Sequence, residues 1–256
     1  MSPLVRTIHG PGDPFAPTQW SVILAAGRSQ AEPEIAQAAL AQLCQTYWAP
    51  LYTFVRSRGH AAPDAEDLTQ NFFAYLIEHK IYLRVDRQKG RFRSFLLACL
   101  KNLLADAHDR ERTLKRGGGH DFLPLNEDQV EAAESMFQTH CGGQASPNED
   151  RTYERTWAET LVTGALDRLA ADYRGEGKEK LFENLKMFLT GGATALPGYS
   201  DRAQRLGSPA STLRGEVARL RARYRETLRA EVRRTVEQDA DVEGELRELL
   251  RVLTEQ

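Results

Sequence analysis

The sequence is poor in cysteine, and its net charge is close to zero. Three cysteines, Cys44, Cys99 and Cys141, occur among 256 residues and form no Cys-x-x-Cys pair, so no zinc knuckle or redox dithiol motif is present. An odd number of unpaired cysteines is typical of a reducing compartment. The formal charge is −2, from 34 Lys+Arg and 36 Asp+Glu, and this balance taken alone argues against a nucleic-acid-binding protein.

Long apolar runs and strand-like alternation are also missing. The start, MSPLVRTIHG, lacks the basic and apolar segments of a signal peptide, and the longest apolar runs, such as FLLACL, are too short to span a bilayer. We therefore expect a cytoplasmic protein without membrane contact. Because neither alternating strands nor internal repeats are visible, the predicted fold class is all-α.

The near-neutral total conceals segments of opposite sign. Residues 84–116 hold ten Lys/Arg and four Asp/Glu, whereas residues 120–150 hold seven acids and no base. Residues 202–234 hold ten Arg and three Glu, and residues 235–256 hold seven acids and two Arg. Basic blocks suit a phosphate backbone, because each Lys or Arg that neutralises a phosphate releases counterions. Solvated helix faces with internal salt bridges are the alternative, which charge alone favours.

Apolar residues recur at helical spacing on both sides of a Gly-rich, acidic segment, which predicts two small helical domains joined by a linker. The helices are expected at residues 20–27, 34–58, 63–79, 92–112, 148–173, 178–189, 200–206 and 209–236. The predicted parts are an N-terminal extension (1–33), a first helical domain (34–116), an acidic flexible linker (117–149), a second helical domain (150–236) and an acidic C-terminal tail (237–256).

The segment 200–236 has the local chemistry of a helix-turn-helix. Gly207 suits the left-handed conformation that ends a helix, Ser208 suits the cap of the next helix, and Pro209 suits its first position. The first turns of the second helix would then enter a DNA major groove, with later arginines on the backbone. A plain helical hairpin with an arginine-rich surface is the alternative. The groove-facing residues would be Ser211, Thr212 and Arg214.

An acidic cluster opens the helix expected at 63–79. Pro63 and Asp64 fit the first helical turn, where acids complement the helix dipole, and spacing alone favours this capping role. A protein-docking face is a second interpretation, because Glu66 and Gln70 lie four residues apart. A catalytic metal site is a third, although no second cluster of acids or histidines supports it.

The basic segment that follows contains aromatic residues. Phe92 and Phe95 lie among Arg91, Arg93 and Lys101, which would suit a groove that stacks bases and binds phosphates. The alternative places both phenylalanines in the core. Phe95 falls on the apolar stripe of its helix and favours the core, whereas the pattern does not decide for Phe92.

Three motifs in this order resemble the extracytoplasmic-function (ECF) class of bacterial RNA polymerase sigma factors, within the sigma-70-like family. They are DAEDLTQNFFAYL, GRFRSFLLACLKNLLAD, and YSDRAQRLGSPAS followed by RLRARYR. The likeness covers roughly residues 35–116 and 150–234. It implies a sigma domain two-like bundle, a sigma domain four-like helix-turn-helix, and a transcription initiation factor that has no enzymatic activity, cofactor or metal.

The resemblance also implies partners and roles. The first domain would bind the clamp helices of the largest subunit of core RNA polymerase through Asp64, Glu66, Asp67, Leu68, Gln70 and Phe73. Arg87, Arg91, Phe92, Arg93, Lys101 and Asn102 would bind and melt the minus-ten promoter element. Ser211, Thr212, Arg214, Arg219 and Arg223 would read the minus-thirty-five element. The polymerase flap and an anti-sigma factor or other regulator are further partners that the family admits.

The chain departs from this family at several positions. Phe95 stands where a tryptophan is usual, and Gly215 and Glu216 interrupt the recognition helix. These departures leave open a sigma-like decoy that binds polymerase or a regulator without initiating transcription. The acidic tail from Thr235 is either a helix that folds over the basic block 202–234 or a solubilising tail.

Overall fold

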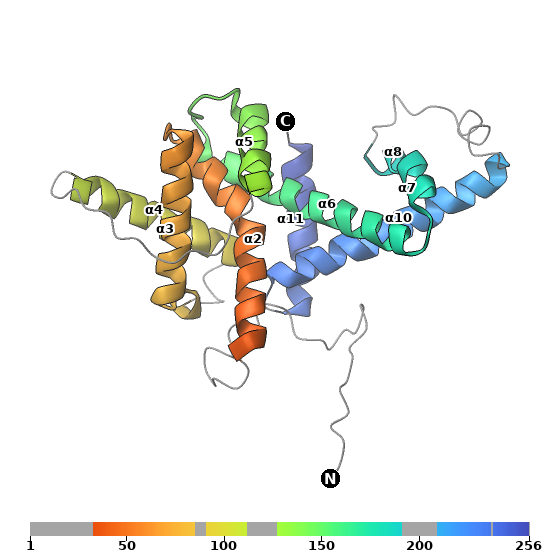
Figure 1. Cartoon of the computed structure of the whole chain (residues 1–256), viewed down its shortest axis with the longest axis horizontal. Coiled ribbons are helices and arrows are strands. Elements are labelled where there is room, and N and C mark those ends of the chain that lie inside the picture. Colours follow the sequence, from red (N-terminus) through yellow and green to blue (C-terminus); the bar gives the residue numbers. More distant parts are fainter. Residues whose placement is uncertain (1–32, 85–90, 112–126, 191–208, 237, 256) are drawn as a thin grey trace, which may run out of the picture. The chain divides into compact units, whose positions relative to one another are not determined.

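The computed structural model describes residues 33–84, 91–111, 127–190, 209–236 and 238–255. Every regular element in these ranges is helical, which confirms the all-α fold class. The elements are α2 (Pro33–Ser57), α3 (Ala62–Glu78), the 3-10 helix η1 (Ile81–Arg84), α4 (Phe92–Glu111), α5 (Glu127–Cys141), α6 (Glu149–Gly175), α7 (Glu179–Leu185), α8 (Met187–Thr190), α10 (Ala210–Thr235), the 3-10 helix η3 (Asp239–Asp241) and α11 (Val242–Thr254) (Figure 1).

Most of these helices agree closely with the predicted ones. The helix expected at 178–189 is divided into α7 and α8, and two helices, α5 and α11, lie where a linker and a tail were expected. The helices expected at 20–27 and 200–206 lie outside the described residues, as do the turn at Gly207, the cap at Ser208 and the N-terminal extension up to residue 32.

Two compact units are present. The first comprises Met1–Thr160 and Arg233–Gln256, and the second comprises Leu161–Val232. Helices α6 and α10 each contribute residues to both units.

The core of the first unit is built on α2. Leu51 and Phe54 of this helix are fully buried, and so are Leu76 of α3 and Leu96 and Leu100 of α4. These residues occupy the helical spacing of the apolar stripes in the sequence. Burial of each such side chain stabilises the fold by about 1.5–3 kcal/mol.

The second unit has its own apolar core. Tyr173 of α6 packs against Phe182 of α7 with ring centroids 5.6 Å apart, and Leu213, Val217 and Leu220 of α10 are buried in the same cluster. The first backbone hydrogen bond of α10 runs from the N–H of Leu213 to the carbonyl of Pro209. Because Leu213, Val217 and Leu220 are buried in this cluster, the apolar stripe of α10 faces the core and the polar residues lie on the other faces of the helix.

Part of the acidic segment predicted to be a flexible linker is a helix, α5, at residues 127–141. Helix α5 packs against α2, with Ala133 and Phe137 buried at or below 1% exposure. Residues 117–126 of the predicted linker lie outside the described residues. The prediction of flexibility is therefore wrong for 127–141, because an apolar face that repeats at helical spacing is present within the acidic composition.

The Gly- and Ser-rich connection after α5 is a defined turn. Gly142 has a φ of +58°, which glycine adopts without strain, and its N–H donates to the carbonyl of Gln138 to end α5. The Asn148 side chain then accepts a hydrogen bond from the N–H of Arg151 at 3.1 Å, which caps α6. The composition of this connection suggested disorder, but its residues form a turn that joins two packed helices.

One carboxylate holds α5 on α2. Arg56 donates from Nε and from a terminal nitrogen to the two oxygens of Glu134, both at 2.8 Å, and the Tyr52 hydroxyl donates to the same carboxylate at 2.6 Å. The Arg56 guanidinium also lies over the Phe137 ring at 4.4 Å. The hydrogen bonds from Arg56, followed by that from Tyr52, lower the pKa of Glu134 to about 2.

Glu134→Gln is expected to lower the free energy of unfolding by about 1.5–3 kcal/mol near neutral pH, because it removes charge-assisted hydrogen bonds. Since the folded-state pKa of Glu134 is depressed from 4.5 to about 2, its contribution is complete above the ordinary pKa and declines as the pH falls through that interval. Urea denaturation of both proteins near neutrality and near pH 3 should therefore show a difference that shrinks in acid. Glu131→Gln, on the exposed side of α5, is the control and should change little at either pH. An equal loss at both pH values would contradict the assignment.

Candidate nucleic-acid interface

The first turns of α3 present the acidic cluster on the surface. Asp64 and Asp67 are exposed, and Gln70 donates to Glu66 at 3.0 Å from a half-buried position beside them. Leu68 is half-buried. Five of the six residues predicted to bind polymerase are therefore at least partly accessible in α3.

Phe73, the sixth, belongs to the core. Its side chain is 4% exposed and its ring meets that of Phe72 edge-on, with centroids 5.7 Å apart. A direct contact with a partner would require this ring to leave the core.

The start of α4 brings together three of the six residues predicted to bind the minus-ten element and buries two of them. Phe92 is 6% exposed and packs edge-on against Tyr47 of α2, with ring centroids 5.5 Å apart. Arg93 is 2% exposed. Arg91 keeps a side chain that is 42% exposed. The undecided case of Phe92 is thus settled in favour of the core, and Arg87 lies outside the described residues.

Lys101 and Asn102 lie further along α4. The ammonium group of Lys101 pairs with Asp150 at the start of α6, at 2.6 Å, and also lies 5.7 Å from the centre of the Phe54 ring. Its side chain is 38% exposed, and Asn102 is exposed. Both residues are accessible to a ligand, although Lys101 already has a partner.

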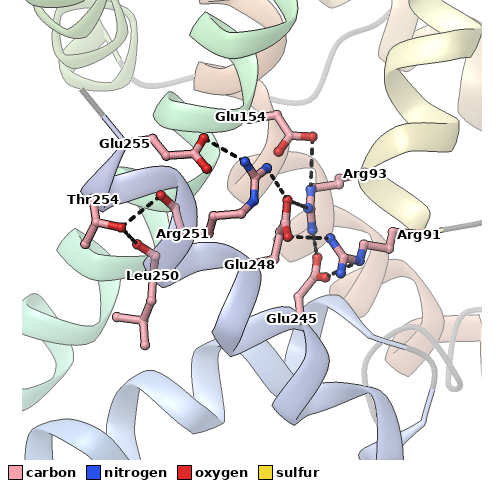
Figure 2. Close-up of polar contacts among 9 residues, drawn as sticks. All are labelled: Arg91, Arg93, Glu154, Glu245, Glu248, Leu250, Arg251, Thr254 and Glu255. Atoms are coloured by element: carbon pink, nitrogen blue, oxygen red, sulfur yellow. Dashed lines mark hydrogen bonds and ion pairs between the residues drawn. The ribbon is translucent and has the colours of Figure 1, made fainter.

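The Arg93 guanidinium lies in a closed polar cluster (Figure 2). It pairs with Glu245 of α11, and contacts Glu248 of α11 at 3.7 Å and Glu154 of α6 at 3.6 Å. The central carbon of the guanidinium, Cζ, lies 4.1 Å from the centre of the Trp157 ring, which is a cation–π contact. We refer to Arg91, Arg93, Glu154, Glu245 and Glu248 as the α4–α11 cluster.

Electrostatics explain why Arg93 stays charged although it is buried. Burial by itself lowers its pKa, but the charges of Glu245 and Glu154 outweigh that effect and leave the pKa above its ordinary value. Its backbone is also held, because the Tyr153 hydroxyl donates to the Arg93 carbonyl at 2.9 Å.

Arg91 completes the α4–α11 cluster at its edge. Its Nε lies 2.9 Å from Glu245 and a terminal nitrogen lies 3.6 Å from Glu248, so each glutamate contacts both arginines. A hydrogen bond from Arg251, followed by the charges of Arg91 and Arg93, lowers the pKa of Glu248. Both basic residues at the start of α4 are thus neutralised from within the chain.

Helix α11 differs from both interpretations of the acidic tail. Asp239 does pair with Arg233 of the basic block 202–234, at 2.9 Å, but Glu245 and Glu248 pair with the other basic block. The sequence contained a signal for this helix, since Val242, Leu249 and Val252 are its buried apolar residues and recur at helical spacing.

The five residues predicted to read the minus-thirty-five element lie in α10, where four of them are exposed and Arg223 is half-buried. Ser211, Thr212 and Arg214 are exposed near its first turns. Arg219 pairs with Glu216 at 2.5 Å, and Arg223 pairs with Glu176 at 2.8 Å.

Arg223 is held from two sides. Its guanidinium lies 4.5 Å from the centre of the Tyr173 ring in addition to the Glu176 contact. Glu176 raises the pKa of Arg223 and has its own pKa lowered by Lys178 and Arg223. Arg223 therefore has a structural role in the second unit.

A line of four arginines runs along α10, and only the first of them, Arg214, is among the residues that the family resemblance singles out. Arg214, Arg221, Arg225 and Arg229 are exposed and follow a spacing of seven, four and four residues, which keeps them on one face of the helix. We call these four residues the α10 arginine stripe. It spans about 22 Å at 1.5 Å per residue.

The acidic residues of α10 lie outside the α10 arginine stripe. Glu216, Glu226 and Glu231 fall at other angles around the helix. Arg221 is positioned by hydrogen bonds from its guanidinium to the carbonyl of Phe188, at 3.1 and 3.3 Å. A row of arginines over this length suits contact with successive phosphates of a duplex.

Comparison with models of protein families, with curated proteins and with solved structures produced no match to this chain. None of the helices in the described ranges is long and apolar enough to cross a membrane. Among those same residues, no group of three or more His, Cys, Asp or Glu side chains is placed to hold a metal ion.

Arg225→Gln is expected to weaken binding to duplex DNA several-fold and to reduce the salt dependence of log K by about 0.9, the value for one lost phosphate contact. The measurement is fluorescence anisotropy with a labelled duplex over a range of salt concentrations. Arg223→Gln is the matched control, since Glu176 and Tyr173 already hold that guanidinium. Equal effects of the two substitutions would favour the motif-based assignment of Arg223 over the stripe.

Proposed function

We propose that this protein is a transcription initiation factor of the ECF sigma type, which binds core RNA polymerase and directs it to promoters whose minus-ten element it melts. It acts without enzymatic chemistry of its own. Its partners are the clamp helices and flap of polymerase, promoter DNA, and a regulator of the anti-sigma kind.

The observation that carries this proposal is the exposed α10 arginine stripe next to Ser211 and Thr212 at the start of the same helix. Side chains in the first turns of such a helix suit base edges, and a row of arginines suits the phosphate backbone. The order of the three sequence motifs adds support, because it links this helix to an acidic docking helix and a basic segment.

Helix α3 fits the polymerase-binding part of the proposal. Asp64 and Asp67 are exposed on it, together with Asn71 one turn further along. A polar, acidic face of this kind suits a partner surface rich in Lys and Arg, where complementary charge raises the rate of association.

One observation favours the decoy as a second candidate function. Phe92 and Arg93, which a strand-melting factor would use on the unpaired bases, are buried, and Arg91 is paired with α11. A protein locked in this arrangement would bind polymerase and duplex DNA without opening the promoter.

Run-off transcription with core polymerase from the cognate bacterium separates the two functions. A sigma factor confers initiation at discrete start sites, which transcript mapping after overexpression would identify. The decoy binds polymerase and yields no open complex. Failure to bind polymerase at all would contradict both candidates.

Asp67→Ala is expected to weaken co-purification with core polymerase by about tenfold, or about 1.4 kcal/mol, while the helical content stays unchanged because Asp67 is exposed. Glu78→Ala, at the other end of α3, is the control and should leave the affinity unaltered. If Asp67→Ala bound as tightly as the parent protein, the docking assignment would fail while the DNA-binding proposal would stand.

A further inference from the structure

We propose that α11 is an internal mimic of a nucleic-acid strand, whose carboxylates Glu245 and Glu248 occupy the arginines at the start of α4 until a polyanionic strand displaces them. The inference rests on the proposed function in one respect, namely that a single strand is the ligand of Arg91 and Arg93. It adds a device that the family resemblance does not contain.

The geometry of the α4–α11 cluster supports this mimicry. Glu245 and Glu248 lie three residues apart on one face of α11, and each contacts both Arg91 and Arg93 (Figure 2). Guanidinium groups bind carboxylates and phosphates through the same planar, forked arrangement of N–H donors. Two carboxylates in this position therefore satisfy the donors that two phosphates would satisfy.

Because Arg93 is buried, α11 would be released when a phosphate replaces its carboxylates, and not by simple dissociation. The Arg93 side chain is 1% exposed, and without α11 its carboxylate partner in the cluster would be Glu154 alone, at 3.6 Å. An incompletely paired guanidinium in a buried site is strongly disfavoured. An incoming phosphate restores the pairing that α11 would give up.

The charge pairing is part of the buried face of α11. Its buried residues are Val242, Glu245, Leu249 and Val252, so one of the four is a carboxylate. Two further leucines of the helix are accessible, since Leu250 is 57% exposed and Leu253 is 38% exposed. A terminal helix held by three buried apolar residues and a buried charge pair is suited to exchange between a docked and a released state.

The test uses the full chain with E245Q/E248Q, which keeps the shape of both side chains and removes both charges. Binding to a short fluorescent single-stranded DNA should tighten by about tenfold, and the salt dependence of log K should rise by about 0.7 for each arginine released. E255Q is the matched control, because its carboxylate pairs with Arg251 at 2.7 Å and its removal should leave binding unchanged. Adding R93Q to E245Q/E248Q should abolish the gain, which would locate it at α4.

Far-UV circular dichroism checks that E245Q/E248Q folds. If this variant does not fold, hydrogen exchange on the unmodified protein tests the inference instead. Hydrogen exchange of residues 242–254 should become faster when single-stranded DNA saturates the protein. Equal DNA affinity of folded E245Q/E248Q and the parent protein, or unchanged exchange in α11 with DNA bound, would overturn the inference. Failure of the proposed function is distinguished from this by run-off transcription, where neither protein would initiate.

Discussion

Burial of the Arg93 guanidinium is the constraint on which the first unit depends. Its side chain is 1% exposed and is surrounded by carboxylates from α6 and α11 and by the Trp157 ring. A cation in such a place is tolerated only when its partners are held in position, and removal of one partner from a buried pair costs about 3–5 kcal/mol. Arg93 and Glu245 are 152 residues apart in the chain, so this pair joins elements that local sequence does not connect.

The two basic blocks of the chain consequently have different surroundings. At the start of α4 the positive charge is balanced by acids from distant parts of the chain, and the aromatic neighbour Phe92 is in the core. In α10 Arg219 and Arg223 pair with glutamates within the second unit, and the four residues of the α10 arginine stripe are exposed. The near-zero net charge is a sum over the whole chain, so it does not exclude a cationic face on one helix.

Sequence patterns predicted those parts of the fold that local periodicity determines. The apolar stripe of α4, with Leu96 and Leu100, was sufficient to place that helix and its buried face. Helix α5 was missed because acidic composition outweighed the spacing of Ala133 and Phe137 in the prediction. The burial of Arg93 could not be predicted, since its partners come from α6 and α11 and no local signal pairs them. The same holds for Arg223, to which the family resemblance gives a DNA contact and which lies over the Tyr173 ring.

The contrast between the two basic blocks implies an order of events if both proposals hold. The α10 arginine stripe is exposed while α11 is docked, so contact with duplex DNA needs no rearrangement. Binding of a single strand at α4 must displace two carboxylates from Arg91 and Arg93, and a ligand shifts such an equilibrium only by its greater affinity for the released state. Weak strand binding by the isolated chain therefore follows from the α4–α11 cluster. Attachment of duplex DNA through α10, or of polymerase, would raise the local concentration of the strand, and displacement of α11 would then follow attachment.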